Sequence, residues 1–239
     1  MPEHADVYRN ETDRYHSLVS FEDFQHNLPK SLNQIIGGTN NRILESGAGT
    51  GRVTKLLAEN SQDLVGFDLS EAMLSKANCV SSPTMPEFRG FAAADQRLLP
   101  VDNDQFDWVV SGWSVCYLVS WLPDNWQQEI QTAMKEFLRV LKHKGKILLI
   151  ETLGTGKIEP DPPSYLANYL NYLDDIGFQH SCIRTDYRFP DQKTAKNLVE
   201  FFFGSDMLPQ ISSAGQPILP ECTGLWVGTK QDITDKLPY

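Results

Sequence analysis

A glycine-rich loop between a predicted strand and a predicted helix constrains the fold of this chain more than any other feature. The loop is Glu45–Gly51, with the sequence Glu-Ser-Gly-Ala-Gly-Thr-Gly. The apolar run 42–45 before it predicts a short strand, and 52–60 after it predicts a helix with one apolar face. Glycines let the backbone approach a ligand and adopt positive φ angles, and the helix beyond offers free N–H groups. This order is typical of nucleotide-type binding loops.

Short apolar runs and helical patterns keep alternating after this loop, up to about residue 150. We predict further strands at 64–67, 88–94, 106–110 and 146–150, a helix that Ser70 caps, and a long helix over 125–142 that Gly145 stops. Beyond them we predict helices at 165–176 and 191–203, a strand-like segment at 184–189 and a last strand at 225–228. The alternation indicates a parallel sheet covered by helices on both faces, and the final strands can add an antiparallel edge.

Composition and charge exclude several classes of protein. The chain has 239 residues, of which 41% are hydrophobic, enough to bury a core. Its formal net charge of −10 argues against binding along a nucleic-acid backbone, which requires clustered Lys and Arg. No run approaches the roughly 18 apolar residues that span a bilayer, and the N-terminus is polar, so we expect a cytoplasmic protein without membrane contact. The four cysteines are far apart, and we expect buried free thiols.

Two acidic residues end the strands that follow the glycine-rich loop. Asp68 comes 17 residues after Gly51, and Asp95 ends the third predicted strand, with Gln96 beside it. A carboxylate at Asp68 can accept both hydroxyl groups of a ribose, or it can cap the next helix. A carboxylate at Asp95 can accept an exocyclic adenine amine, or it can be an ordinary turn residue. Loop and acids share the carboxyl edge of the sheet, where open α/β sheets bind ligands.

These motifs resemble the class I S-adenosylmethionine-dependent methyltransferases, in their small-molecule (methyltransferase type 11/25-like) branch. The resemblance covers about residues 40–152. It rests on the E-x-G-x-G-T-G loop, on Asp68 in Val-Gly-Phe-Asp-Leu-Ser, on Asp95 in Ala-Ala-Asp-Gln, and on the segments 106–110 and 138–146. The family usually has Pro-Gly-Gly before the fifth strand, where this chain has His-Lys-Gly, a difference that affects the turn and not the site.

The resemblance implies S-adenosylmethionine as cofactor and S-adenosylhomocysteine as product. The glycines would pack against the methionine end, Asp68 would hold the ribose, Leu69 and Met73 would flank the adenine, and Ser111 would offer a backbone carbonyl. The implied cofactor-binding residues are Glu45, Gly47, Ala48, Gly49, Gly51, Asp68, Leu69, Met73, Asp95, Gln96, Ser111 and Tyr15. The implied fold is a Rossmann-like three-layer αβα sandwich with a mostly parallel seven-stranded sheet, an antiparallel last strand and a helical N-terminal lid.

We expect one methyltransferase domain over residues 1–239, in three parts. Residues 1–37 form the lid, 40–152 the cofactor-binding core, and 153–239 the acceptor-side helices with the final strand pair. The Asn/Asp/Ser-Pro-Pro-aromatic motif of enzymes that methylate nucleobase amines is absent after the fourth strand. The similar string at 161–165 follows the fifth strand, so we interpret it as a loop. Together with the charge, this argues for a small-molecule acceptor.

The acceptor pocket is expected to use Tyr8, Trp113, Tyr117 and Glu151, although the aromatic residues can equally be core or lid packing. The catalytic residues are unknown. Glu151, His16 and His26 are weak candidates for a base, and methyl transfer can proceed by proximity and orientation alone. No acidic or histidine cluster has metal-binding spacing.

The predicted function is methyl transfer to an O, N or C atom of a small molecule by a monomer or a homodimer. Two alternatives stay open. An NAD(P)-dependent oxidoreductase would prefer G-x-G-x-x-G spacing, whereas this loop has G-x-G-x-G. A non-catalytic scaffold would bind the cofactor without turnover.

Overall fold

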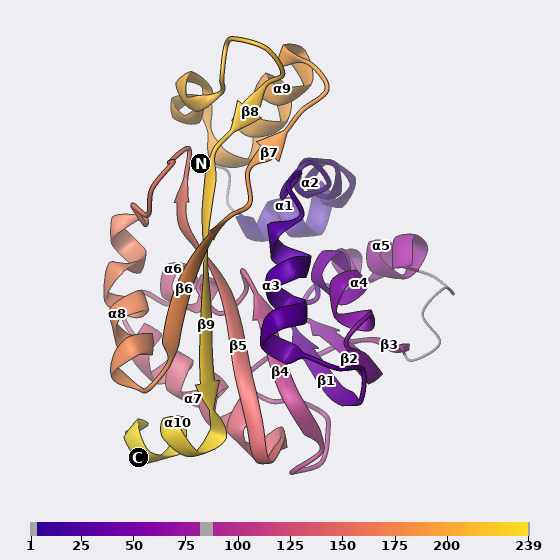
Figure 1. Ribbon diagram of the computed structural model, residues 1–239, viewed down its shortest axis with the longest axis vertical. Helices are drawn as coiled ribbons and strands as arrows, with labels where there is room; N and C mark the ends of the chain where they lie inside the picture. Colours follow the sequence, from indigo (N-terminus) through magenta and orange to yellow (C-terminus); the bar gives the residue numbers. More distant parts are fainter. Residues whose placement is uncertain (1–3, 82–87, 239) are drawn as a thin grey trace.

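A seven-stranded sheet crosses the middle of the molecule in the computed structural model, which describes residues 4–81 and 88–238 (Figure 1). The strand order is β3-β2-β1-β4-β5-β9-β6. The strands are β1 Asn41–Ser46, β2 Ser61–Asp68, β3 Phe88–Ala93, β4 Phe106–Gly112, β5 Leu141–Thr155, β6 Gln179–Arg184 and β9 Glu221–Thr229. β9 pairs antiparallel with both of its neighbours, and the other pairs are parallel. The predicted sheet is confirmed.

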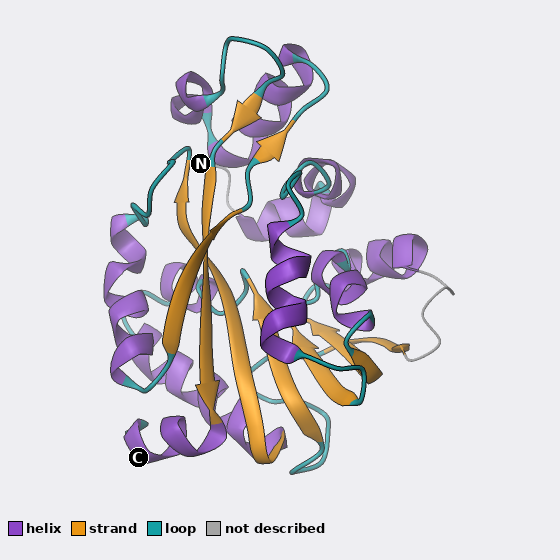
Figure 2. Cartoon of the chain, viewed as in Figure 1, coloured by secondary structure: helices purple, strands orange, loops and turns teal. Residues whose placement is uncertain are grey.

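Helices cover both faces of the sheet, as Figure 2 shows. They are α1 His4–Asn10, α2 Thr12–Val19, α3 Asn27–Ile36, α4 Arg52–Ala58, α5 Glu71–Ser81, α6 Tyr117–Trp121, α7 Trp126–Val140, α8 Ala167–Asp175, α9 Gln192–Phe203 and α10 Lys230–Lys236. Two 3₁₀ turns, η1 Ser164–Leu166 and η2 Ser205–Gln210, precede α8 and follow α9. The apolar residues of the strands alternate between the two faces, so each face has its own core.

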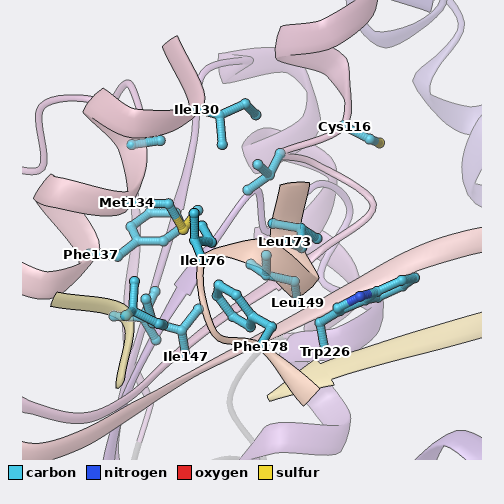
Figure 3. Packing of buried hydrophobic residues seen from close by; sticks show 14 of the residues in the cluster. Cys116, Ile130, Met134, Phe137, Ile147, Leu149, Leu173, Ile176, Phe178 and Trp226 are labelled. Carbon is cyan, nitrogen blue, oxygen red and sulfur yellow. The ribbon is translucent and has the colours of Figure 1, made fainter. Parts of the chain in front are cut away.

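The larger core lies between the sheet and helices α6, α7, α8 and α10. Figure 3 shows Met134 and Phe137 of α7 packed with Ile147 and Leu149 of β5 and with Trp226 of β9. The opposite core joins α3 and α4 to the other face, where Ile43 and Leu148 are fully buried. Because both faces are covered, the central strands are apolar on both sides.

The segments that follow β1, β2 and β4 lie at one edge of the sheet. β1 lies between β2 and β4, with Ser46 of β1 opposite Phe67 of β2 and Ser111 of β4. Parallel strands in this register end together. The glycine-rich loop after β1, the start of α5 after β2 and the segment after β4 therefore adjoin one another.

A third, smaller core lies beyond this edge. α1 and α2 pack there with α9 and with a two-stranded sheet of β7 Tyr187–Arg188 and β8 Ile218–Leu219 (Figure 1). Phe189, Val199 and Leu18 are fully buried in it. Segments from the two ends of the chain thus form one cover over the loop edge, while α3 covers the sheet itself.

Three local predictions are wrong. Gly145 does not stop the long helix, because α7 ends at Val140 and β5 begins at Leu141, which pairs with Phe106 before a bulge. The predicted strand 184–189 is divided between two sheets, because the carboxylate of Asp186 accepts the backbone N–H of Glu221 at 2.9 Å and turns the chain out of the main sheet. Of the four cysteines, Cys79 and Cys182 are exposed, although all four are free.

Truncation of a side chain in the larger core should strongly destabilise the protein. Phe137→Ala should lower the free energy of unfolding by about 3–5 kcal/mol, since the ring is fully buried and leaves a cavity. Lys135→Ala, on the exposed face of the same helix, serves as the control and should stay within about 0.5 kcal/mol. Urea unfolding measures both changes; equal effects of the two substitutions would show that α7 does not pack as described.

Candidate functional site

The glycine-rich loop adopts backbone angles that require glycine. Gly47, Gly49 and Gly51 have φ angles of 77°, 54° and 81°. The N–H groups of Gly47 and Ala48 donate to the carbonyl oxygen of Phe67 at 2.7 and 2.9 Å, which ties the loop to the end of β2. A Cβ atom on Gly47 would lie 2.2 Å from the Cβ atom of Ser114. This close approach explains the first glycine, and the positive angles explain all three.

Asp68 joins the loop to the next helix. Its carboxylate accepts the N–H of Gly49 at 2.8 Å and the N–H of Ser70 at 2.8 Å. Asp68 does not itself cap α5: Ser70, the predicted cap, accepts the N–H of Met73 at 3.4 Å through its hydroxyl group, and Asp68 holds Ser70 in place. Burial raises the pKa of Asp68, and the two N–H donors lower it in part. The same residue lines the cavity at this edge and can also serve a ligand.

A first cavity of about 260 Å³ lies against the loop. The structure brings eight of the predicted cofactor-binding residues to its wall: Tyr15, Gly47, Gly49, Asp68, Leu69, Met73, Asp95 and Gln96. The predicted pocket residues Tyr8, Trp113 and Tyr117 also line it. Their positions therefore agree with a common site, whereas the role of each residue stays a prediction.

Asp95 and Gln96 differ in whether their side-chain oxygen atoms already accept hydrogen bonds. Arg97 donates to Asp95 through its backbone N–H and its Nε atom, both at 2.9 Å, and pairs with Glu129 at 2.6 Å. The hydrogen bonds from Arg97 lower the pKa of the Asp95 carboxyl group. The Oε1 atom of Gln96, by contrast, is buried and accepts no hydrogen bond. At this end of the cavity, Gln96 has the free acceptor atom.

Four predicted cofactor residues lie off the wall of the cavity: Glu45, Ala48, Gly51 and Ser111. Glu45 is 1% exposed and accepts the hydroxyl group of Thr54, so its carboxyl group links β1 to α4. Burial raises the pKa of Glu45 to about 8. Gly51 precedes α4 in a left-handed conformation, and Ser111 is fully buried in the sheet. These four residues belong to the loop and its supporting strands but do not line the cavity.

The candidates for a catalytic base lie outside both cavities of the site. Glu151 is fully buried and accepts the hydroxyl group of Tyr169 at 2.8 Å and the N–H of Cys116 at 3.2 Å. Burial raises the pKa of Glu151 to about 7. His16 contacts the hydroxyl group of Thr50 at 3.0 Å, and His26 precedes α3 with a φ of 57°. The structure therefore does not bring these three residues to a ligand.

A second cavity, of about 480 Å³, adjoins the first, and Trp113 and Tyr117 of the predicted acceptor pocket line it, whereas the contribution of β7 and α9 was not foreseen from the sequence. Tyr15, Trp113 and Tyr117 line both cavities, so the two share a wall. The hydroxyl groups of Tyr8 and Tyr117 are hydrogen-bonded to each other. The aromatic residues that line only the second cavity are Tyr165, Tyr187, Phe202 and Phe203, and Met207 lies beside them. The Phe-Phe-Phe end of α9 was the available signal in the sequence.

Charged groups lie in the wall of the second cavity. Arg52 forms an ion pair with Glu22, and its guanidinium group lies 3.9 Å from the centre of the Trp113 ring. Glu221, at the start of β9, is 2% exposed, and its Oε1 atom accepts the hydroxyl group of Thr152 at 2.7 Å. Burial, together with the neighbouring charge of Glu22, raises the pKa of Glu221 to about 8.

In the described part of the chain, no group of three or more His, Cys, Asp or Glu side chains is placed to hold a metal ion. None of the helices within residues 4–81 and 88–238 has both the length and the apolar character needed to cross a bilayer. The wall of the first cavity has the Asp68 carboxylate, each oxygen of which accepts one backbone N–H, and Gln96, whose Oε1 atom accepts none; carboxylate and amide acceptors suit the ribose and the adenine of an adenosine-like group.

Known proteins that are similar to this chain are methyltransferases. Residues 44–149 match the family described as "Methyltransferase domain". A demethylmenaquinone methyltransferase of Lactococcus lactis is 29% identical over 203 residues, which cover 78% of this chain and 74% of that protein. An uncharacterized methyltransferase of Staphylococcus carnosus is 23% identical over 183 residues, which cover 73% and 81%.

Solved structures show the same fold. A SAM-dependent methyltransferase of Aquifex aeolicus superposes with a TM-score of 0.55 at 13% identity, over 91% of this chain and 96% of that one. A phosphoethanolamine N-methyltransferase 2 of Haemonchus contortus, in complex with phosphomonomethylethanolamine and S-adenosylhomocysteine, gives 0.57 at 16% identity, over 95% and 58%.

The buried Glu45 should make stability depend on pH. Its pKa is about 8 in the folded chain and near 4.5 when unfolded, so the folded form retains a proton that the unfolded form releases. Stability should therefore fall as the pH rises from about 5 to about 8. Other buried acids add to this fall, but Glu45→Gln should reduce it by an amount on the order of a few kcal/mol.

Urea unfolding at both pH values tests this expectation, with Glu159→Gln, at an exposed position, as the control. Parallel stability curves for wild type and Glu45→Gln would contradict the raised pKa.

Proposed function

We propose that the chain, which matches the methyltransferase domain family over residues 44–149, methylates a small molecule bound in the second cavity, with S-adenosylmethionine in the first. The observation that carries this proposal is the shared wall of Tyr15, Trp113 and Tyr117. Two ligands in adjoining cavities of one protein can be held with their reacting atoms side by side. Such positioning supplies much of the rate of a group transfer.

The residues of the first cavity suit each part of the cofactor. Asp68 would hold the ribose hydroxyl groups, and Gln96 would accept the adenine amine in the place expected for Asp95. The backbone at Gly47 and Gly49 would lie against the methionine portion. When bound, S-adenosylmethionine supplies a methyl group that its sulfonium already activates. The chain then has to orient the acceptor and exclude water.

The second cavity suits a small acceptor with an apolar body. Its aromatic walls come from the segment after β4, from η1, and from β7 with α9. Aromatic and apolar linings with a few polar groups are typical of small-molecule sites. The net charge of −10 supports the same choice over a nucleic acid. The α1–α2 segment and the region 153–239 would supply much of the acceptor side, together with the segment after β4, and the predicted division of the chain into 1–37, 40–152 and 153–239 stays a prediction.

A ring carbon is the second candidate for the methylated atom. The Lactococcus relative is a demethylmenaquinone methyltransferase by name, and the aromatic walls of the second cavity also suit a flat ring. An S-adenosylhomocysteine-release screen over amines, phenols, quinones and carboxylates would separate this candidate from oxygen and nitrogen acceptors. Cofactor binding without turnover on any class of the screen would instead support the scaffold alternative.

The cofactor site has a direct test. S-adenosylhomocysteine at about 100 times its Kd should stabilise the fold by about 2.7 kcal/mol. Asp68→Ala should remove most of this stabilisation, because it takes away the ribose acceptor and the partner of Gly49 N–H. Asp102→Ala, at an exposed position, should leave it unchanged. Thermal or urea unfolding with and without ligand measures the shift.

Three results would count against the proposal. The first is an undiminished shift in Asp68→Ala, which would remove Asp68 from the site. The second is the absence of any shift in the wild type. The third is stabilisation by NADH alone, which would favour the oxidoreductase alternative.

A further inference from the structure

Glu221 is a buried carboxyl group that the proposed methyl transfer does not use. It is the first residue of β9, it lines the second cavity, and it is 2% exposed. Its Oε1 atom accepts the Thr152 hydroxyl group, and the Thr155 hydroxyl group also favours its ionised form. Its Oε2 atom has neither solvent contact nor a hydrogen-bond partner. A buried oxygen of this kind costs free energy unless a ligand compensates it.

The charges around the second cavity leave Glu221 without a cation. The acids of the wall are Glu22, Asp161 and Glu221, and the cations are Arg52 and Lys157. Arg52 is paired with Glu22, and Lys157 lies 2.7 Å from Asp161. His4 also lines the wall, but burial lowers its pKa and favours its neutral form. Among the described residues of this wall, the three acids therefore outnumber the two cations by one.

The aromatic rings that line the second cavity also favour a positively charged ligand. Tyr187 lies in the wall with Glu221, and Trp113, Tyr165 and Phe202 complete its faces. Ring faces attract cations, as Arg52 already does over Trp113. An acid without a cation and several aromatic rings in one wall together form a site for a positively charged group on an apolar body. When Glu221 is ionised, an ammonium group would neutralise it, whereas a carboxylate ligand would meet an excess of negative charge.

Building on the proposed methyl transfer, we propose that the second cavity selects an acceptor with a protonated amine on an apolar body, and that Glu221 pairs with this ammonium group. Because an ammonium group has no lone pair, the contact orients the acceptor and does not itself attack the methyl group. Glu221 is thus a positioning and specificity residue. Its raised pKa agrees with a group that lacks its cation in the free protein.

Three probes with the same ring test the proposal: phenethylamine, phenethyl alcohol and phenylacetate. Calorimetric titration into the protein saturated with S-adenosylhomocysteine, at about pH 7, keeps the amine protonated. Phenethylamine should bind about tenfold or more tightly than phenethyl alcohol, and phenylacetate most weakly. Equal affinity for the amine and the alcohol, preference for phenylacetate, or no binding of phenethylamine would each overturn the proposal.

Substitution at Glu221 then assigns the preference to this residue. Glu221→Gln keeps the shape of the side chain and should reduce phenethylamine affinity about tenfold, while the alcohol changes less than about twofold. Glu159→Gln is the matched control at an exposed position and should change neither. An amine preference that persists in Glu221→Gln would remove Glu221 from the proposal. If Glu221→Gln does not fold, Glu221→Asp, which retains the charge, should keep the amine preference, and its loss would overturn the assignment.

The outcome is independent of the cofactor proposal. Stabilisation by S-adenosylhomocysteine is measured first, in wild type and in each variant. If that stabilisation is absent, the proposed function fails; if it is present and the amine preference is absent, only the inference about Glu221 fails.

Discussion

The pair of hydrogen bonds accepted by Asp68 holds the functional edge of this protein together. One bond fixes Gly49 in the loop after β1, and the other fixes Ser70 at the start of α5. Both depend on the parallel register of β1 and β2, which places the ends of the two strands next to each other. The wall of the first cavity at Gly49 and Asp68 follows from that placement, whereas the approach of Ser114 to Gly47 and the shared wall at Trp113 and Tyr117 depend on the pairing of β1 with β4. The carboxylate therefore has a structural role before any ligand binds.

The sequence was informative where neighbouring residues decide the structure. The apolar runs of β1, β2 and β4 have strands on both sides and helices on both faces, so their composition is sufficient to identify them. The loop glycines and Asp68 follow directly from such strands, and the cofactor half of the site was predictable for the same reason. The end of α7 was not predictable. Leu141 is apolar, like the buried face of the helix, but it pairs with Phe106 as the first residue of β5.

The acceptor half of the site could not be predicted in this way. Its charged residues come from the segment after α2, from the start of α4, from the segment after β5 and from β9, far apart in the chain. Tyr187 and Phe202 belong to elements whose place beside the cofactor edge depends on a small separate sheet. The prediction of Glu151 as a pocket residue illustrates the difficulty. Its position at the sheet edge was foreseen, but its carboxyl group lies among Tyr169 and Cys116, outside the cavities.

The place of β9 in the sheet has a consequence for the synthesis of this chain. β9 lies between β5 and β6, although almost all of the chain precedes it, and β6 has hydrogen-bonded contact in the sheet only with β9. During translation β6 must wait, unpaired, until residues 221–229 have emerged from the ribosome. The cofactor edge, made of β1, β2 and β4, can form long before then. The wall of the second cavity includes Glu221 of β9, so the strands of the cofactor edge are synthesised well before that wall is complete.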